Sequence, residues 1–280
     1  MTNPRRPDGR GPTIGVFDSG VGGLTVLRAL LDRIPAANYL YFGDTARLPY
    51  GSKSAATVAH YAVGAIRHLQ SQGAELLVIA CNTATALAFD EIKAASQVAT
   101  IGVVEPGAEA ASKTSRNRKV VVIGTDATIA SHAYRRALEV RNVSVREKAC
   151  PLFVPLVEEG WIDHPVTEQV ARIYLDEAFS GDACEADVLV LGCTHYPLIR
   201  PLLSRIAPAH VAIVDSAEST AQEVARQLQI EPLASAAEPE RRVAPRLKFY
   251  ATDSAEKFKR MGSRFLGLPV DDVVHVDLKE

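Results

Sequence analysis

Short runs of aliphatic and aromatic residues recur along the chain, and each is followed by a polar turn and a stretch with helical spacing. Several runs are apolar at every position, which is typical of strands buried on both faces of a parallel sheet. Between them, apolar residues share one helical face, as Leu24, Leu27 and Leu30 do. The alternation predicts an α/β fold. The predicted strands are 14–17, 39–42, 76–79, 120–123, 188–191, 211–214, 247–250 and 273–276.

Two parts of the chain resemble each other in this pattern. Residues 13–20 and 120–127 both predict a strand, a short polar turn and a helix. In each part a cysteine at the end of a later strand follows at a similar distance, since 81 − 18 = 63 and 193 − 126 = 67 residues. We therefore predict two α/β units, each with its cysteine on a later strand.

The ends of the chain differ in composition from the rest. Residues 231–245 are rich in Pro, Ala and charge, and predict a surface loop. The strand–helix–strand pattern at 247–276 is too small to close a core alone, so we expect it to complete the first unit. Residues 1–10 contain two arginines without an apolar core behind them, which predicts a disordered lead and not a signal peptide.

The bulk properties narrow the class of protein. A length of 280 residues allows one large domain or two ordinary ones. Hydrophobic content of 47% and charged content of 23% are typical of a soluble globular protein. A formal net charge of −2 gives no drive toward nucleic acid or anionic membranes. Because no apolar run approaches the roughly 20 residues that span a bilayer, we predict a cytoplasmic protein without a nucleic-acid or membrane partner.

Two of the four cysteines stand in matching contexts. Cys81 and Cys193 each follow a predicted buried strand and are followed at once by amide, hydroxyl or imidazole groups. Ligands of an open parallel sheet bind beyond the carboxyl ends of its strands. A helix that begins just after each thiol would favour thiolate and bind a carboxylate. Two thiols facing one substrate would suit the movement of a proton on and off carbon.

Other readings of the cysteines stay open. A free cysteine is commonly a small buried hydrophobe. Cys150 and Cys184 lack the polar context and are expected to be structural or incidental. The four cysteines form no CxxC pair, so neither a disulfide framework nor a zinc knuckle is expected.

Polar residues near these strands have two interpretations each. The segment 18–20 either points a carboxylate and a hydroxyl into the cleft or caps a helix. The glycines at 20–23 fail the dinucleotide pattern G-x-G-x-x-G because Thr25 takes the last position. His195 is either a proton-exchanging neighbour of the thiol or a core histidine. Glu158, taken by itself, would lie on an exposed helix face.

Together these segments match a family: the chain resembles glutamate racemases, the cofactor-independent enzymes that supply D-glutamate for bacterial peptidoglycan. The match extends over most of the chain in family order, apart from the residues before Thr13 and the loop at 231–246. The matching segments are IGVFDSGVGGLTV (14–26), YFGDTARLPYG (41–51), ACNTATA (80–86), VVEPG (103–107), CPLFVPLVEEG (150–160) and GCTHYPLI (192–199).

The resemblance implies a two-base mechanism, in which one thiolate removes the α-proton and the opposite thiol returns one to the other face. By the family's pattern, Cys81 acts on D-glutamate and Cys193 acts on L-glutamate. Asp18 would assist the first thiol, and His195 and Glu158 the second. The two directions of racemisation then need not be equally sensitive to one mutation. The implied substrate-binding residues are Asp18, Ser19, Tyr50, Gly51, Asn82, Thr83, Thr194 and His195, with Thr128 as a further candidate.

No cofactor and no metal are expected. Pyridoxal phosphate would need a Schiff-base lysine, and the cysteine, Asp18 and Tyr50 motifs contain none. Lys53, just after the last of them, is expected at a solvated helix start. Neutral donors would instead stabilise the carboxylate of the substrate in a site closed to water. Donors of this kind are Ser19, Asn82, Thr83 and Thr194.

The resemblance implies two similar α/β lobes, each with a parallel sheet flanked by helices, and an active site in the cleft between them. The first lobe would comprise residues 1–104 plus 215–280, and the second residues 105–214. Glutamate is the expected small-molecule substrate, and a homodimer is left open.

Three alternatives remain at this point. An aspartate racemase, or another two-cysteine racemase or isomerase, shares the thiol pair but needs a different pocket length. A Cys-His hydrolase would use Cys193 as its single nucleophile and leave Cys81 without a role. A non-catalytic amino-acid-binding module would bind ligand without exchanging its α-proton.

Overall fold

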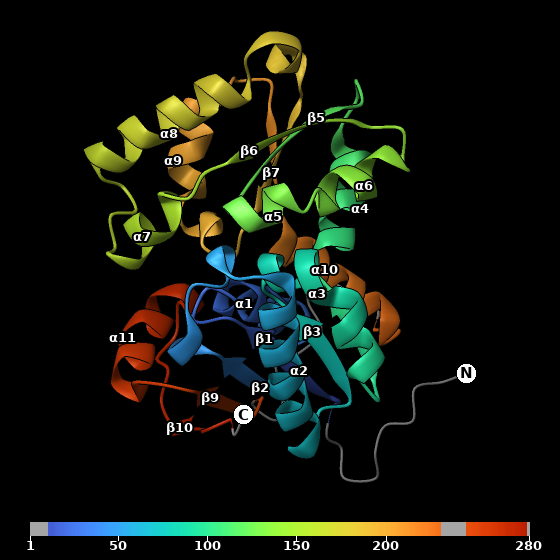
Figure 1. Cartoon of the computed structure of the whole chain (residues 1–280), viewed down its shortest axis with the longest axis vertical. Helices are drawn as coiled ribbons and strands as arrows, with labels where there is room; N and C mark the ends of the chain where they lie inside the picture. The colour runs from blue at the N-terminus through green and yellow to red at the C-terminus, as the bar shows by residue number, and fades with distance from the viewer. Residues whose placement is uncertain (1–10, 231–244, 279–280) are drawn as a thin grey trace, which may run out of the picture.

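Two parallel sheets, one above the other in Figure 1, organise the chain. The computed structural model describes residues 11–230 and 245–278. One sheet has six strands in the order β10-β9-β2-β1-β3-β4, and the other has four in the order β6-β5-β7-β8. Every paired strand runs parallel to its neighbour. The carboxyl ends of all strands in a sheet therefore lie at one edge, which is where a site can form.

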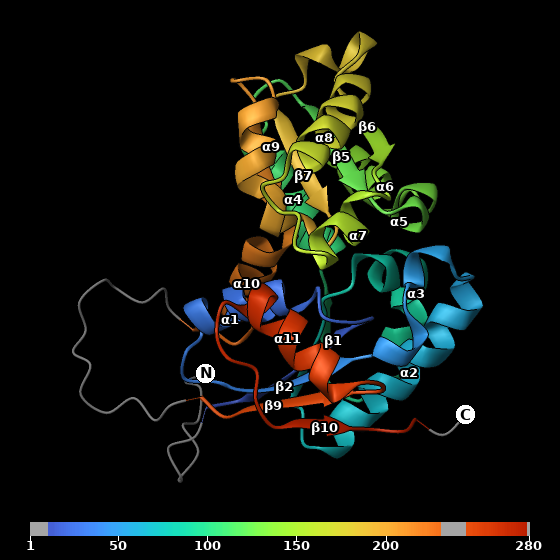
Figure 2. The same ribbon diagram turned by 90° about the vertical axis from the view of Figure 1, so that its left-hand side faces the viewer.

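The six-stranded sheet is covered by helices on both faces (Figure 2). Alternate residues of β1 explain this, because successive side chains of a strand point to opposite faces. Ile14 and Val16 pack in the core that contains α1, α10 and α11, whereas Phe17 packs with α2 and α3. The strands are β1 (Thr13–Asp18), β2 (Asn38–Gly43), β3 (Leu76–Ile79), β4 (Ala99–Gly102), β9 (Leu247–Ala251) and β10 (Val273–His275). The helices are α1 (Leu24–Arg33), α2 (Ala55–Ser71), α3 (Asn82–Ala95), α10 (Ser216–Gln227) and α11 (Ala255–Leu266).

The four-stranded sheet repeats this arrangement. Val121 and Leu189 face the core that contains α7 to α9, and Val120 and Val188 face the core under α4 and α6. Its strands are β5 (Lys119–Gly124), β6 (Ser144–Ala149), β7 (Val188–Gly192) and β8 (Ala212–Asp215). Its helices are α4 (Val104–Thr114), α5 (Asp126–Ala130), α6 (Ala133–Glu139), α7 (Phe153–Glu158), α8 (Pro165–Ala178) and α9 (Arg200–Ile206). Short 3₁₀ turns are η1 (Thr45–Arg47), η2 (Tyr50–Ser52), η3 (Gly181–Glu185) and η4 (Tyr196–Ile199).

The predicted α/β class is confirmed, and each of the eight predicted strands is present. Two further strands, β4 and β6, were not predicted. Both are edge strands with partly exposed residues, so neither forms an apolar run. The tail strand β9 pairs with β2, and β10 extends the sheet beyond β9, although both tail strands are far from β2 in sequence (Figure 2). The lobe boundaries at residues 104 and 215 stay a prediction.

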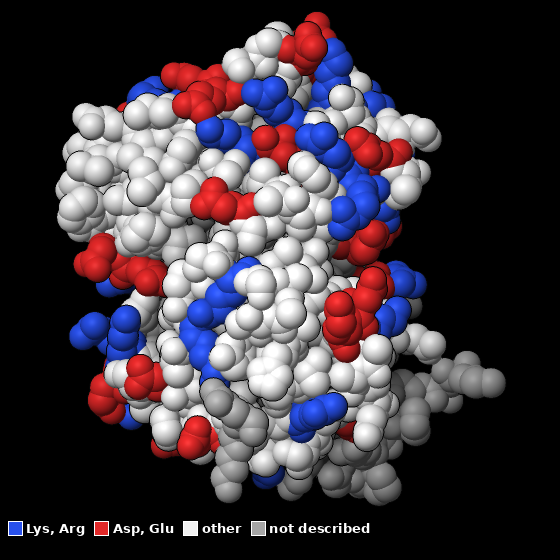
Figure 3. All heavy atoms as spheres, in the orientation of Figure 1, with Lys and Arg blue, Asp and Glu red and all other residues white. Residues whose placement is uncertain are grey.

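Three further observations concern the surface charge, the length of the helices and the residues outside the described ranges. Acidic and basic side chains are interspersed over the face in Figure 3 and are not gathered by sign. Within residues 11–230 and 245–278, no helix is long and apolar enough to cross a bilayer. The predicted lead at 1–10 and the predicted loop at 231–245, apart from residue 245, lie outside the described residues.

Candidate active site between the two sheets

One cavity lies where the carboxyl ends of β1, β3 and β7 approach each other. Its volume is about 410 Å³. Both thiols, Cys81 and Cys193, line this cavity. Two larger hollows, one beside α1 and α10 and the other beside α3 and α6, contain neither thiol. The structure thus brings together ten of the predicted site residues: Ser19, Tyr50, Gly51, Cys81, Asn82, Thr83, Glu158, Cys193, Thr194 and His195. Asp18 is the exception, because it lies buried behind the lining.

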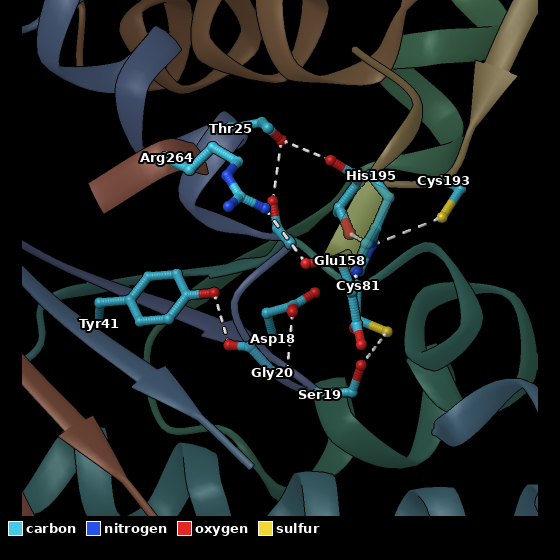
Figure 4. A network of polar contacts seen from close by, with 12 residues as sticks. Asp18, Ser19, Gly20, Thr25, Tyr41, Cys81, Glu158, Cys193, His195 and Arg264 are labelled. Atoms are coloured by element: carbon cyan, nitrogen blue, oxygen red, sulfur yellow. Dashed lines mark hydrogen bonds and ion pairs between the residues drawn. The ribbon is translucent and has the colours of Figure 1, made fainter. Parts of the chain in front are cut away.

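The first half of the site is built around Cys81. This residue leaves β3 and caps α3, where its Sγ accepts a hydrogen bond from the Ala84 N–H at 3.4 Å. The thiol lies 3.5 Å from the hydroxyl of Ser19 (Figure 4). Asp18 is 1% exposed, and its Oδ2 accepts from the Gly20 N–H at 2.8 Å. The other oxygen, Oδ1, is buried without a hydrogen-bond partner and is therefore available to a proton or a ligand.

Both titratable groups of this half have raised pKa values. Burial and the charge of Asp18 raise the pKa of Cys81 to about 12, although the hydrogen bond with Ser19 and the nearby N–H groups lower it. Burial also raises the pKa of Asp18, although the charge of His195 and three backbone N–H groups oppose the shift. Desolvation penalises the charged form in both cases. The first half therefore rests with a neutral thiol.

The second half of the site is a chain of three side chains. The Nδ1 of His195 lies 3.9 Å from the Sγ of Cys193, and its Nε2 lies 3.1 Å from Oε1 of Glu158 (Figure 4). Burial lowers the pKa of His195, but hydrogen bonds and charge from Cys193 and Glu158 outweigh it and raise that pKa to about 10. Burial raises the pKa of Glu158, but the hydrogen bond and the charge of His195 outweigh burial, so the pKa of Glu158 is lowered. At neutral pH this half therefore holds an imidazolium–carboxylate pair.

The two thiols do not sit at equivalent helix starts. The α-helix after Cys81 begins at the next residue, as predicted, but a 3₁₀ turn follows Cys193 and α9 begins only at Arg200. Pro197 has no N–H to donate to the Cys193 carbonyl, so the Tyr196 N–H donates to it instead, at 3.2 Å. The prediction of a helix directly after Cys193 is therefore wrong. His195, not a row of helical N–H groups, lies beside this thiol.

A second local prediction also needs correction. The interpretation of the segment 18–20 as a helix cap is wrong, because α1 begins at Leu24 and its cap position is Gly23, which has no side chain to donate or accept. The Asp18 carboxylate accepts a hydrogen bond inside its own turn instead. The reason is that residues 20–23 form a turn between β1 and the helix, which separates Ser19 from the first helical N–H groups.

Neutral donors line the cavity next to Cys81. Asn82 accepts a hydrogen bond from the Tyr134 hydroxyl at 2.7 Å through Oδ1, while its Nδ2 is buried without a partner. The hydroxyl of Thr83 lies 3.0 Å from that of Thr125, which caps α5 after strand β5 of the other sheet. Thr128 is fully buried and bonds to both threonines, so it supports the lining without forming part of it. The free amide of Asn82 points to a ligand with an acceptor oxygen.

The loop after β2 supplies another wall of the cavity. The Tyr50 hydroxyl donates to Oδ2 of Asp44 at 2.6 Å, so it is already committed. Asp44 is fully buried and also accepts from Arg47 and from the hydroxyl of Thr252. Tyr50 therefore offers its ring and backbone to the cavity. Lys53 lies outside the lining, just before the cap of α2 at Ser54.

Several lining residues were not singled out from the sequence. Thr125 and Asp126 occupy the turn that the internal resemblance matches to the turn at 18–20, so a signal for them existed. The apolar wall before Glu158 lies within the matched segment 150–160. The remaining missed residues are Leu48, Pro49, Ser52, Pro151, Val154 and Pro155.

The lining is poor in cations. Among the described residues that line it, His195 is the only basic one, beside the acidic residues Asp126 and Glu158. Carboxylates of a ligand would therefore meet neutral hydroxyl and amide donors. In the described part of the chain, no group of three or more His, Cys, Asp or Glu residues could hold a metal ion. Of the remaining cysteines, Cys150 is buried and Cys184 is exposed, and neither lines the cavity.

Comparison with known proteins gives one consistent result. Residues 14–224 match the family model described as Asp/Glu/Hydantoin racemase. A glutamate racemase of Koribacter versatilis (strain Ellin345) is 60% identical, over 95% of this chain and 98% of that protein. A glutamate racemase isoform of Bacillus anthracis superposes with a TM-score of 0.87 at 36% identity, over 96% of this chain and 98% of that one. The glutamate racemase of Francisella tularensis, solved in complex with D-glutamate, has a TM-score of 0.83 at 33% identity, over 95% of this chain and 98% of that one.

Proposed function

Because the chain belongs to the Asp/Glu/hydantoin racemase family and is an amino-acid racemase, we propose that it interconverts L- and D-glutamate by proton transfer between two thiols. The observation that carries the proposal is that Cys81 and Cys193, from different sheets, line one cavity. The substrate is inferred from the relatives, one of which was solved with D-glutamate bound. The reaction needs no cofactor in this proposal.

In the L-to-D direction, Cys193 as thiolate removes the α-proton and becomes a thiol. Cys81 gives its own proton to the opposite face of the α-carbon and becomes a thiolate. The imidazolium of His195, next to Cys193, stabilises the thiolate before the transfer. No atom is gained or lost by the substrate apart from this exchange of one proton for another.

In the D-to-L direction, Cys81 must first lose its proton. Asp18 is the nearby group that takes it, since its Oδ1 is buried without a hydrogen-bond partner, and burial raises the pKa of this carboxylate and so makes it a stronger base than an exposed one. Cys193 then returns a proton to the opposite face. His195 and Glu158 resupply that proton through the hydrogen bond at Nδ1.

Negative charge develops next to the α-carboxylate when the proton leaves. The proposed donors for this carboxylate are neutral: the free Nδ2 of Asn82 and the hydroxyls of Thr83 and Thr194. Fixed donors in a site with little water stabilise developing charge better than water does, because they need no reorganisation during the reaction. Burial of these three residues, each at 6% exposure or less, supports that role.

We further propose that the product D-glutamate serves peptidoglycan synthesis and that the enzyme works in the cytoplasm. This part rests on the resemblance to glutamate racemases. A homodimer stays a prediction.

The most direct test follows glutamate in heavy water by NMR and circular dichroism, with aspartate as the comparison substrate. We expect both enantiomers of glutamate to racemise and to take up solvent deuterium at the α-carbon, and aspartate to react much more slowly. If the enzyme turned over aspartate faster than glutamate, aspartate and not glutamate would be its substrate. Binding of glutamate without deuterium uptake would contradict the racemase proposal as a whole, and an acyl adduct on Cys193 would favour a hydrolase.

A further inference from the structure

Helix α11 belongs to the six-stranded sheet but contacts the acid–base pair of the other one. Its residues Arg264 and Phe265 are neighbours in sequence, and each contacts one member of the His195–Glu158 pair. Figure 4 shows the guanidinium of Arg264 reaching toward Glu158, on the side away from Cys81. The pair that assists the second thiol is therefore held from the opposite lobe.

The contact to Glu158 is made at the end of α7. The last carbonyl groups of a helix lack donors within the helix, and a cation at this end stabilises it. Arg264 supplies both a donor and a positive charge at this end of α7, because its Nη1 donates to the Glu158 carbonyl at 3.1 Å. Gly160 makes room for this contact: a Cβ at that position would lie 2.8 Å from Arg264 Nη1, and its φ of +83° suits glycine. Arg264 thus fixes the backbone that carries the Glu158 carboxylate.

The contact to His195 is made by an aromatic ring. Phe265 is 1% exposed, and its ring meets the imidazole edge-on at a centroid distance of 5.1 Å and an angle of 79°. Such pairs have a preferred geometry. The ring of His195 is therefore held in the plane that lets Nδ1 reach Cys193 and Nε2 reach Glu158.

We propose that Arg264 is a positioning residue for racemisation, which holds Glu158 against His195 from the other lobe, with Phe265 as its partner on the imidazole. The inference rests on the proposed function and deepens it. Arg264 does not line the cavity, so it is not a catalytic residue. It lines a separate hollow of the surface beside α1, which solvent reaches from outside.

The expected consequence concerns the protonation of His195. The groups that face this ring are Cys193 from its own segment, Glu158 from α7 and Asp18 from β1, while Lys257 of α11 acts on Glu158. If α7 loses its anchor, Glu158 moves from Nε2 and the imidazolium loses a stabilising anion. The pKa of His195 should then fall, and the second thiol should lose part of its assistance.

The test compares Arg264→Gln and Arg264→Lys with Arg260→Gln. Arg260 is an exposed arginine on the same helix, so it controls for loss of charge on α11. We expect Arg264→Gln to lower kcat about 10-fold with little change in KM, because displacement of a supporting residue weakens geometry without removing a reacting group. Arg264→Lys should recover part of the rate, and Arg260→Gln should behave like the unmodified protein.

A second readout separates positioning from a general loss of structure. The titration of His195, followed by NMR of labelled imidazole, should shift to lower pH in Arg264→Gln and return partly in Arg264→Lys. A slower Arg264→Gln enzyme with an unchanged His195 titration would overturn the proposal, and so would an unchanged rate. If the unmodified chain does not racemise glutamate, the proposed function fails instead, while the titration still reports whether Arg264 positions the pair.

Discussion

The two halves of the site use the same local device but place different ionisable groups beside their thiols. Each places a cysteine at the carboxyl end of a buried central strand, Cys81 after β3 and Cys193 after β7. The first thiol is neutral beside a buried Asp18, whereas the second lies beside an imidazolium–carboxylate pair. The segments after the two thiols differ as well, because an α-helix follows Cys81 directly and a 3₁₀ turn that contains Pro197 follows Cys193. Similar strands therefore do not produce similar acids and bases.

This asymmetry is limited by thermodynamics. L- and D-glutamate have equal free energies in water, so their equilibrium constant is unity for every variant. The ratio kcat/KM must then change equally in both directions, whichever half a mutation affects. Unequal sensitivity of the two directions can appear only in how that change divides between kcat and KM, or in steps that stop before inversion.

The largest effect is expected from removing one thiol. Cys81→Ala and Cys193→Ala should each lower racemisation by about 10⁴-fold, at the upper end of the usual range, because a proton-transfer group is lost. Each variant should still exchange the α-proton of one enantiomer in heavy water without inverting it: L-glutamate for Cys81→Ala and D-glutamate for Cys193→Ala. The exchange of L-glutamate should be the faster, since the remaining thiol has the imidazolium beside it. Full racemisation by Cys193→Ala would exclude the two-thiol mechanism.

The next effect separates the helpers of the two thiols. Asp18→Asn and His195→Asn should each lower kcat/KM by roughly 10²- to 10³-fold, within the usual range for acid–base groups. The pH profiles should differ, however, because only His195→Asn removes a group with a pKa of about 10 and thus the alkaline limit of activity. Steady-state rates between about pH 6 and pH 11 would show this. A near-normal rate for Asp18→Asn would mean that the neutral Cys81 thiol needs no neighbour to take its proton.

The sequence predicts those features of the two half-sites that depend on the local pattern of apolar and polar residues. Fully buried strands form apolar runs, and the residues after them must meet at one edge of a parallel sheet, so the part of the lining at the strand ends follows from spacing. Tyr50, Gly51 and Glu158 are instead implied by the family resemblance. The edge strands β4 and β6 lack such a run and escape prediction.

Contacts between the lobes could not be predicted in the same way. Tyr134 and Asn82 are 52 residues apart, Thr25 and Thr194 are 169 apart, and Arg264 and Glu158 are 106 apart. No periodicity relates such pairs, because they depend on how two separate sheets face each other. The turn at Pro197 has a local signal instead, because proline lacks the N–H that a continuous α-helix after Cys193 would need.

A third prediction concerns pH and stability in the second half. The folded-state pKa of His195, about 10, lies above its ordinary value of 6.5, so folding binds a proton. The resulting stability is fully present below about pH 6.5 and is lost as pH rises toward 10. Glu158→Gln removes one cause of the raised pKa, so its free energy of unfolding should depend less on pH over this window. Urea titrations at about pH 6 and pH 9 would measure the difference. An unchanged pH dependence would show that Glu158 does not hold the His195 proton.

The smallest effects are expected from two hydroxyls that tie each half to the opposite lobe. Tyr134 donates to the side chain of Asn82, next to Cys81, and Thr25 donates to the backbone carbonyl of Thr194, next to Cys193. Tyr134→Phe should raise KM a few-fold, because loss of a hydrogen bond worth about 1 kcal/mol frees the Asn82 amide to rotate. Thr25→Val should change KM less, since the backbone itself holds the Thr194 carbonyl. Steady-state kinetics of both variants would check this order, and a larger effect of Thr25→Val would mean that the second half depends more on the contact between the lobes than the first.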